Sequence, residues 1–280
     1  MLTDLKTILT KERKNGTAIA SFNTPNSSTI RAVIEAAEEL NVPVIIAHAQ
    51  LHERVAPLDF ISPIMVECAR RAKIPVCVHL DHGEDFDYIK RAVDLGFTSV
   101  MIDGSTEGLE KNKKITKKVT EYSHKHNVSV EAELGKLLRN EAGIYTGSTE
   151  SEYTNLDIVA EFVDFTDVDV LAIAFGAIHG IYDKPPILNF DIINQCKAKT
   201  NCPLVMHGGS GMSIDNYKEL IKRGIAKINY YTYMSYDGFA AAKKYTAAKD
   251  KGYFHDLADD AYLAMKANAL KTLKIFSNIK

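Results

Sequence analysis

The sequence predicts an α/β protein that folds as a closed (β/α)8 TIM barrel with an additional C-terminal helix. Short β-branched segments alternate with longer amphipathic segments from one end of the 280-residue chain to the other. The short segments are apolar throughout, as expected for parallel strands that are buried on both faces. No linker or low-complexity tract interrupts the alternation, so we expect one domain over residues 1–280. A doubly wound open sheet is the alternative architecture.

Eight segments have the composition of buried strands, which is the number that a TIM barrel requires. They are TAIASFN (17–23), VPVIIAH (42–48), PVCVHLDH (75–82), TSVMID (98–103), SVEAEL (129–134), VLAIAFG (170–176), PLVMHGG (203–209) and KINYYT (227–232). Because helical patterns lie between them, the strands are expected to run parallel.

The segments between the strands show helical periodicity. Ile30, Val33 and Ile34 are spaced to share one face of a helix, and a second such pattern covers 86–93. A final stretch, roughly 255–278, predicts another long helix that covers the barrel or forms a subunit contact.

One region, 136–155, is polar and too long for a usual connection between a strand and a helix. It has no clear strand or helix pattern. Loops of this kind in compact domains are usually functional lids or disordered. We therefore expect a functional lid or a disordered segment here.

The composition excludes several classes of partner. Lys and Arg together number 34 against 36 Asp and Glu, so the formal net charge of -2 argues against nucleic acid or an anionic membrane as the main partner. The start of the chain has no apolar core of a secretory signal, and no apolar run approaches about 18 residues. We expect a cytoplasmic protein. The four cysteines form no CxxC pair and lie in apolar stretches, as reduced buried thiols do.

Polar residues recur where the predicted strands end, and these ends share one mouth in a barrel. They are Asn23 after the first strand, Asp81 and His82 after the third, Asp103 after the fourth, Glu131 and Glu133 in the fifth, His179 after the sixth, His207 closing the seventh and Asn229 in the eighth. Burying this many polar groups costs several kcal/mol unless they pair or bind a metal ion.

Histidines follow three of these strands. His82, His179 and His207 should converge at the mouth, and three imidazoles with an open fourth position are typical of catalytic zinc. Any one of them alone would more often be an ordinary core or surface residue. His79 alternates with Asp81 and is expected inside the barrel. His48 and the nearby His52 follow the second strand, where either could contact a substrate.

A glycine-rich turn predicts a phosphate site. His207-Gly208-Gly209-Ser210-Gly211 joins the seventh strand to a helix, and Asn229-Tyr230-Tyr231-Thr232 closes the eighth strand. Loops after strands seven and eight form the recurring phosphate site of such barrels, because backbone N–H groups gather there near a helix N-terminus. Glycine lets the backbone approach the phosphate. A tight connection without a ligand is the alternative.

With these features the chain resembles the class II, zinc-dependent ketose-bisphosphate aldolases, in the fructose- and tagatose-bisphosphate aldolase branch. Four segments in this order carry the resemblance, which extends from ASFN at the first strand to KIN at the eighth. They are His79-Leu80-Asp81-His82, Val130-Glu131-Ala132-Glu133-Leu134-Gly135, Gly176-Ala177-Ile178-His179-Gly180-Ile181-Tyr182 and His207-Gly208-Gly209-Ser210-Gly211.

The resemblance implies a role for each candidate. It implies that His82, His179 and His207 hold Zn²⁺, that Glu133 contacts the metal in some states, and that Asp103 orients the site or holds a second metal. It further implies that Asp81 exchanges a proton with the aldehyde oxygen and that Glu141 abstracts the substrate proton. Phosphate would bind at Gly180, Gly208, Ser210 and Thr232, assisted by a monovalent cation (Na⁺ or K⁺), while Asn23 and Asn229 contact the substrate.

The implied reaction is the reversible cleavage of a ketose phosphate, such as fructose 1,6-bisphosphate or tagatose 1,6-bisphosphate, to dihydroxyacetone phosphate and an aldehyde. A Zn²⁺-stabilised enediolate would be the intermediate. The chain departs from the family pattern around the pocket. Ala49 replaces a common serine that faces the aldehyde half, and Tyr230 and Tyr231 replace smaller or acidic residues beside the phosphate loop. Leu138 and Arg139 stand where the loop before Glu141 usually has two glycines. We expect an aldehyde partner that differs from the usual one.

Two other functions stay open. A metal-dependent sugar-phosphate isomerase or epimerase would share the metal and phosphate sites, and only its products would differ. A non-catalytic sugar-phosphate sensor is disfavoured by the presence of Asp81 with all three histidines. A homodimer or homotetramer is expected, because such barrels commonly pair and the last helix places Leu257, Ala261, Ala264 and Met265 at helical spacing. Packing of the same residues on the outer helices of the barrel is the alternative.

Overall fold

Eight parallel strands close into a barrel in the computed structural model, which describes residues 1–13, 16–136, 138–141, 144–146, 153–182 and 184–279. The strands follow one another around the ring in chain order, and β12 closes it by pairing with β2. They are β2 (Ile19–Asn23), β3 (Val44–Ala49), β4 (Val76–Gly83), β5 (Ser99–Ile102), β6 (Ser129–Leu134), β9 (Val170–Ile173), β11 (Leu204–Met206) and β12 (Ile225–Tyr230). The predicted barrel is confirmed, and the open sheet is wrong.

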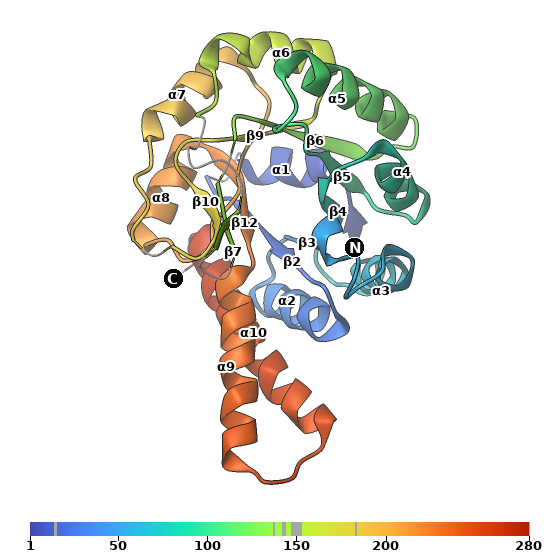
Figure 1. Cartoon of the computed structure of the whole chain (residues 1–280), viewed down its shortest axis with the longest axis vertical. Helices are drawn as coiled ribbons and strands as arrows, with labels where there is room; N and C mark the ends of the chain where they lie inside the picture. Colours follow the sequence, from blue (N-terminus) through green and yellow to red (C-terminus); the bar gives the residue numbers. More distant parts are fainter. Residues whose placement is uncertain (14–15, 137, 142–143, 147–152, 183, 280) are drawn as a thin grey trace.

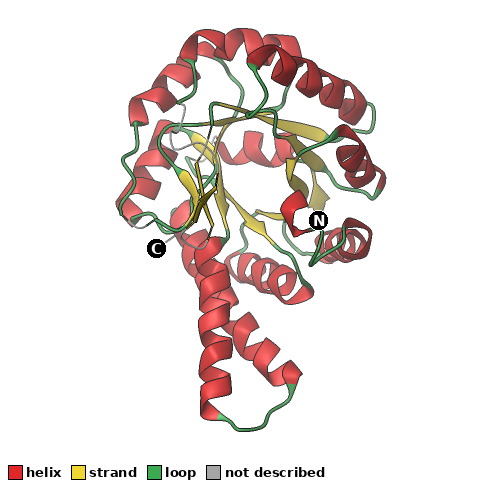
Figure 2. Ribbon diagram, viewed as in Figure 1, coloured by secondary structure: helices red, strands yellow, loops and turns green. Residues whose placement is uncertain are grey.

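Helices form an outer layer around the yellow strands in Figure 2. They are α2 (Ser27–Leu40), α3 (Leu58–Arg71), α4 (Phe86–Asp94), α5 (Leu109–His124), α6 (Val159–Thr166) after the short turn η2 (Leu156–Ile158), α7 (Phe190–Lys199) and α8 (Ile214–Arg223). Local sequence sets their ends. Asn26 and Thr29 form a capping box at the start of α2, and Gly224 ends α8 with a φ of 103°.

The N-terminal segment closes one end of the barrel, a feature that the sequence did not predict. The short strand β1 (Leu2–Thr3) pairs with the beginning of β4, and α1 (Leu5–Arg13) follows. Leu5 and Leu9 of α1 are fully buried against inward-facing residues of the strands, such as Ile45 and Val170. In Figure 1, α1 is visible behind the opening of the barrel. The opposite end, where the strands terminate, is therefore the open mouth.

The predicted C-terminal helix is present, and a second long helix precedes it. α9 (Thr232–Ala248) and α10 (Phe254–Phe276) form a hairpin, and the end of α10 packs on the barrel near α2 and α8. In Figure 1 the rest of the hairpin projects away from the barrel. The first residue of α9 lies at the mouth, so this helix also contributes to the functional site.

The irregular region 136–155 contains strands, which corrects the expectation of a plain loop. β7 (Leu138–Glu141) and β8 (Ile144–Thr146) form an antiparallel pair, and β7 also pairs in parallel with β10 (Ile178–Gly180). The pairing partner of β7 lies about 40 residues later in the chain, so local periodicity could not reveal it. Glu141 ends β7, but its side chain lies outside the part of the molecule that the structure describes.

Two further expectations concern the chain as a whole. Over the described residues, no helix is both long and apolar enough to cross a membrane. All four cysteines are free thiols. Cys77 and Cys196 are buried as expected, whereas Cys68 and Cys202 are only half-buried.

Candidate active site

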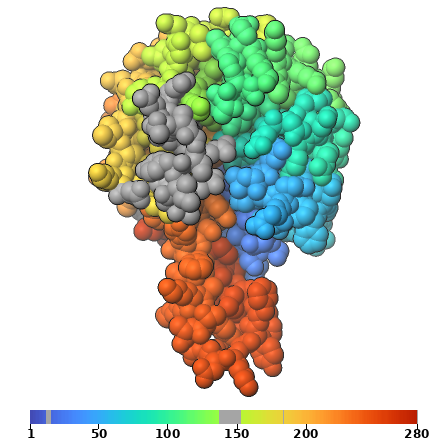
Figure 3. All heavy atoms as spheres, viewed as in Figure 1, coloured from blue at the N-terminus to red at the C-terminus, as the bar shows by residue number. Residues whose placement is uncertain are grey.

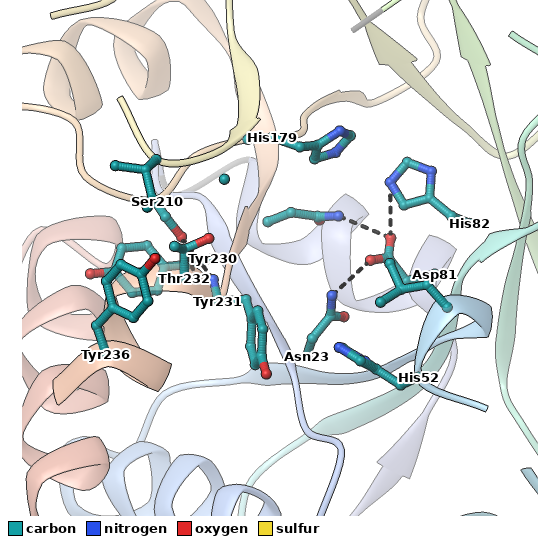
Figure 4. A pocket seen from close by; sticks show the side chains of 15 residues that line it. Asn23, His52, Asp81, His82, His179, Ser210, Tyr230, Tyr231, Thr232 and Tyr236 are labelled. Carbon is teal, nitrogen blue, oxygen red and sulfur yellow. Dashed lines mark hydrogen bonds and ion pairs between the residues drawn. The ribbon is translucent and has the colours of Figure 1, made fainter. Parts of the chain in front are cut away.

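A cavity of about 270 Å³ opens at the mouth of the barrel. Figure 4 shows His179, His82 and Asp81 on one side of it and Ser210 and Thr232 on the other. The lining residues are Asn23, Leu51, His52, Asp81, His82, His179, Gly180, Ile181, Gly208, Ser210, Asn229, Tyr230, Tyr231, Thr232 and Tyr236. The structure thus brings most of the predicted site residues into one pocket. His207, Glu133 and Asp103 are not among the lining residues but lie beside His82 at its wall.

The three predicted histidines converge. One nitrogen from each of His82, His179 and His207 lies within 4.8 Å of the others. The closest pair is Nδ1 of His207 and Nε2 of His82, 3.0 Å apart. His82 has a left-handed backbone with a φ of 47°, next to an irregularity in the pairing of β4 with β5. In a regular strand, Asp81 and His82 would face opposite sides, and this conformation lets both side chains line the pocket.

In two of these rings, a carboxylate bonds the nitrogen that does not face the other histidines. Nδ1 of His82 lies 2.8 Å from Oδ2 of Asp103, and Nε2 of His207 lies 2.8 Å from Oε1 of Glu131. Each neutral ring that donates to its carboxylate directs a lone pair toward the other ring. Two lone pairs 3.0 Å apart repel unless a cation or a proton lies between them. Carboxylate–histidine pairs of this kind orient metal ligands in proteins.

Two further carboxylates, Glu133 and Asp103, lie close to the histidine cluster. Oε2 of Glu133 is 3.6 Å from Nδ1 of His207, on the side that faces the other imidazoles. Asp103 also accepts from the backbone N–H and the hydroxyl of Ser105. His82, Asp103 and Glu133 form a second group whose ligand atoms lie within 4.8 Å of one another. Both carboxylates therefore remain within reach of a metal ion at this cluster.

The electrostatics of the cluster follow from its carboxylates. Burial alone would lower the pKa of His82, but Asp81 and Asp103 raise it to about 9. Burial lowers the pKa of His207, and the hydrogen bond that its ring donates to Glu131 only partly offsets this. Burial opposes ionisation of Asp81, yet the neighbouring histidines hold the pKa of that carboxyl well below its usual range. Asp81 is therefore a carboxylate at neutral pH.

Two amides fix the Asp81 carboxylate. Nδ2 of Asn23 donates to Oδ2 at 3.1 Å, and Nδ2 of Asn229 donates to Oδ1 at 3.0 Å. Figure 4 shows Asp81 between Asn23 and His82. Oδ1 of Asn229 is buried and has no hydrogen-bond partner among the described residues. This arrangement orients Asp81 and leaves one amide oxygen as an acceptor at the pocket wall.

The glycine-rich turn forms the opposite wall. The hydroxyl oxygen of Ser210 accepts from the backbone N–H groups of Tyr231 and Thr232, at 2.8 and 3.1 Å. Its proton remains to be donated to a further acceptor. Thr232 is the first residue of α9, where the helix dipole favours an anion. Tyr182 donates to the carbonyl oxygen of Gly208 at 2.8 Å and thereby braces the turn.

The Gly208→Ala variant should lose stability and activity together. Gly208 has a φ of +66°, and a Cβ there would lie 2.1 Å from the carbonyl oxygen of Ile178, next to His179. The left-handed conformation alone costs about 1–2 kcal/mol in a residue with a side chain, and the clash adds to this. Thermal unfolding and enzyme assays measure both effects.

Two glycines provide the controls for this variant. Gly16 also has a positive φ, +68°, but a Cβ added there has no atom within 4 Å. Gly16→Ala therefore measures the backbone strain without the clash. Gly108→Ala also meets nothing within 4 Å and has a negative φ, so it should lose only the small contribution of glycine as the N-cap of α5. If Gly208→Ala were no less stable and no less active than Gly16→Ala, the close approach to β10 would be wrong.

The two histidines after β3 separate. His52 lies in the short turn η1 (Gln50–His52) and lines the pocket. Its ring packs edge-on against the ring of Tyr231, with 5.4 Å between the ring centroids. His48 is fully buried outside the pocket, and its Nε2 lies 2.9 Å from the hydroxyl of Tyr88. Tyr88 in turn donates to Glu53 at 2.6 Å. Only His52 is placed to contact a substrate.

Acid should destabilise the protein partly through His48. Burial, reinforced by His52, lowers the pKa of His48 from 6.5 to about 4. Below pH 6.5 His48 is protonated in the unfolded chain but stays neutral in the folded protein. The free energy of unfolding therefore falls as the pH drops from 6.5 to 4. The full difference between the two pKa values of His48 corresponds to roughly 3 kcal/mol of the free energy of unfolding.

His48→Gln tests this origin, because glutamine retains a polar group for Tyr88 without titrating. When the pH is lowered from 7 to 4.5, the midpoint of denaturant unfolding should fall less in the variant than in the parent protein. His126→Gln, at an exposed position, should change with pH as the parent does. Equal losses in all three proteins would show that His48 does not contribute.

Several functional groups were missed from the sequence. Leu51 and Tyr236 line the pocket, and Lys227 lies fully buried below it. Glu131 appeared as a polar strand residue without a role, although its partner is His207. A lysine inside the apolar strand segment KINYYT was the signal for an internal ion pair, since buried lysines are almost always paired.

Comparisons with known proteins identify the family of this chain. The family model of class-II fructose-bisphosphate aldolase matches residues 3–279. YdjI of Escherichia coli K12 is 36% identical over 261 residues, which cover 93% of this chain and 92% of YdjI. A fructose-bisphosphate aldolase of Staphylococcus epidermidis RP62A is 38% identical over 234 residues, which cover 82% of this chain and 81% of that protein.

Solved structures share the architecture. The crystal structure of the YdjI aldolase from E. coli K12 matches with a TM-score of 0.88 at 35% identity and covers 99% of this chain and 97% of that one. A fructose-bisphosphate aldolase from Campylobacter jejuni, at 20% identity, matches with a TM-score of 0.81 over 99% and 96% of the two chains and supports the fold alone. The chain belongs to the class-II fructose-bisphosphate aldolase family.

Proposed function

We propose that this protein is a zinc-dependent aldolase that reversibly cleaves a ketose phosphate, such as fructose 1,6-bisphosphate or tagatose 1,6-bisphosphate, to dihydroxyacetone phosphate and an aldehyde. The observation that carries the proposal is the convergence of three histidine nitrogens within 4.8 Å beside a fixed carboxylate. The Ser210 turn stands opposite them in the same cavity. A metal site, a proton-transfer group and a phosphate site are the parts that this reaction needs.

The donor set suits zinc. Three imidazoles with an open position are a common catalytic zinc site, and His82, His179 and His207 would hold the ion. The fit rests on one nitrogen of each ring lying within 4.8 Å of the others, while Asp103 and Glu131 bond the opposite nitrogens of His82 and His207. Bound zinc would act as a Lewis acid toward the substrate carbonyl. Glu133 and Asp103 stay candidates for further metal contact.

Asp81 is the group that we assign to proton transfer. In cleavage, the bond between C3 and C4 breaks, its electron pair stays with C3, and the C4 hydroxyl gives its proton to the Asp81 carboxylate. In condensation, the same group returns that proton to the aldehyde oxygen. The amides of Asn23 and Asn229 hold the carboxylate in place for this step. The unpartnered Oδ1 of Asn229 is suited to accept a substrate hydroxyl.

The phosphate of the dihydroxyacetone half would bind at the turn of Gly208 and Ser210, at the N-terminus of α9. Gly180 and Thr232 line the same wall. Ser210 donates its free hydroxyl proton, and the helix dipole favours the anion. A monovalent cation at this end is a prediction from the family resemblance. Proton transfer at C3 by Glu141 is likewise a prediction from the resemblance.

The aldehyde half would face Leu51, His52 and Tyr231, whereas Tyr236 lies beside Ser210 and Thr232 in Figure 4. Tyr230 also lines the pocket, and its ring packs edge-on against Phe22 with 5.8 Å between the ring centroids. This end of the cavity is thus formed largely by aromatic and apolar side chains. It supports the expectation that the aldehyde partner differs from the usual one.

The test follows dihydroxyacetone phosphate release from fructose 1,6-bisphosphate and, separately, from tagatose 1,6-bisphosphate. Release that EDTA abolishes and Zn²⁺ restores is the expected result, and the ratio of the two rates begins to identify the substrate. Cleavage that persists after chelation, with no zinc in the protein, would contradict the metal aldolase. Conversion of a sugar phosphate to its isomer without carbon–carbon cleavage would favour the isomerase instead.

A homodimer or homotetramer is the assembly that we expect. The α9–α10 hairpin, which extends from the barrel in Figure 3, exposes Phe239, Tyr253 and Phe254 to 69%, 72% and 83%. Exposed aromatic side chains in one region are typical of interaction surfaces. Light scattering at several protein concentrations determines the oligomeric state.

A further inference from the structure

A fully buried ion pair lies in the barrel below the histidine cluster. Lys227 of β12 and Glu131 of β6 are both 0% exposed, and Nζ of Lys227 lies 2.7 Å from Oε2 of Glu131. Neither group lines the cavity, and the proposed reaction uses neither of them. Charged groups are rarely buried this completely, because leaving water is costly even for a pair. The position of the pair under the site therefore calls for a functional reason.

Glu131 connects Lys227 to a metal ligand. Its Oε2 accepts from Lys227, and its other oxygen, Oε1, lies 2.8 Å from Nε2 of His207. A carboxylate can only accept here, so Nε2 of His207 carries the proton and Nδ1 keeps its lone pair. That lone pair faces Nε2 of His82 at 3.0 Å. The orientation and the tautomer of His207 thus depend on where Glu131 is held.

A second contact fixes Lys227 itself. Its Nζ lies 3.3 Å from Nε2 of His79, which is fully buried, and Nδ1 of His79 lies 2.9 Å from the hydroxyl of Ser99. Burial and the charge of Lys227 lower the pKa of His79 to about 3, so the ring is neutral. Its Nε2 can then accept from Lys227 while Nδ1 donates to Ser99. Residues of β4, β5, β6 and β12 join in this one network.

We propose that Lys227 is a positioning residue for the metal site, which acts through Glu131 to hold His207 with Nδ1 toward His82 and His179. Asp103 holds His82 directly from a loop at the mouth, whereas His207 is held from inside the barrel. Without Lys227, Glu131 has no fixed cation to set the position of Oε2. The inference rests on the proposed zinc site, and its test does not depend on the aldolase reaction.

The experiment measures zinc affinity in the full-length protein by competition with a chelating dye. Lys227→Met should weaken zinc binding by ~10–100-fold, the range seen when groups behind metal ligands are removed. The matched control is Lys113→Met, because Lys113 is also buried and ion-paired, to Glu161 at 2.5 Å, but lies on α5 outside the barrel. It should lose stability without losing zinc affinity. The absorption spectrum of the Co²⁺-substituted protein should change only in the Lys227 variant.

A double-mutant cycle tests the route through Glu131. Glu131→Gln should weaken zinc binding, and adding Lys227→Met to it should cause little further loss. Lys227→Gln retains a donor for Glu131 and should recover part of the zinc affinity that Lys227→Met loses. It also serves as the test variant if Lys227→Met does not fold. Zinc affinity within about twofold of the parent in both Lys227 variants would overturn the proposal. Weakened zinc binding in a protein that cleaves no ketose phosphate would instead refute only the proposed reaction.

Discussion

Replacing His82 with asparagine should remove zinc from the protein and reduce ketose phosphate cleavage by at least ~10³-fold, since the site loses one of its three imidazoles. Asparagine is chosen because residue 82 has a φ of 47°, and asparagine tolerates this left-handed conformation better than alanine does. The fold should therefore survive the change. Metal analysis after dialysis and dihydroxyacetone phosphate release together measure the effect.

The control for this variant is His126→Asn, at an exposed position of the chain after α5. It should bind zinc and cleave substrate as the parent does. A His82→Asn protein that kept stoichiometric zinc and full activity would show that the histidine cluster is not the metal site. If zinc were lost while cleavage persisted, the metal would be structural and the proposed chemistry would be wrong.

Asp81→Asn should lower kcat by ~10²–10⁴-fold, the usual contribution of a group that transfers a proton, while leaving zinc bound. The substitution preserves the size of the side chain but removes a carboxylate oxygen that can take a proton. It also places an amide next to the donor groups of Asn23 and Asn229. KM should change far less than kcat, because Asp81 is assigned to the reacting proton and not to the phosphate.

Asn23→Ala is the comparison for this effect. It removes one of the two amides that orient Asp81 and leaves the carboxylate itself, so its loss in kcat should be clearly smaller. Zinc content and thermal unfolding should match the parent in both variants. An Asp81→Asn enzyme with the kcat of the parent would remove Asp81 from the mechanism and transfer the proton step to another group.

Much of the fold could be predicted because its signals are local. Apolar strand segments and periodic helices repeat along the chain, and the strands that they predict lie within a few residues of the observed ones. The parts that were missed depend on contacts between distant segments. α1 is an ordinary amphipathic helix until Leu5 and Leu9 are seen to fill the end of the barrel, and β7 becomes a strand only through its pairing with β10.

The same division applies to the site. Asp81, His82, His179 and His207 could be singled out because strand ends meet at one mouth in a parallel barrel, whatever the details of packing. Their individual roles could not. Whether a carboxylate such as Asp103 faces the shared centre or the far nitrogen of His82 depends on distances of a few ångströms, which sequence spacing does not contain.

The sequence by itself determined the barrel, the three histidines and the glycine turn at its mouth, since these follow from periodicity and from residue types at strand ends. Only the tertiary structure decided that Asn23 and Asn229 clamp Asp81, that His48 is buried against Tyr88, and that Lys227 pairs with Glu131. The reason is physical. Hydrogen bonds and ion pairs act over about 3 Å, so they depend on how separate elements pack, whereas hydrophobic periodicity is a property of each element alone.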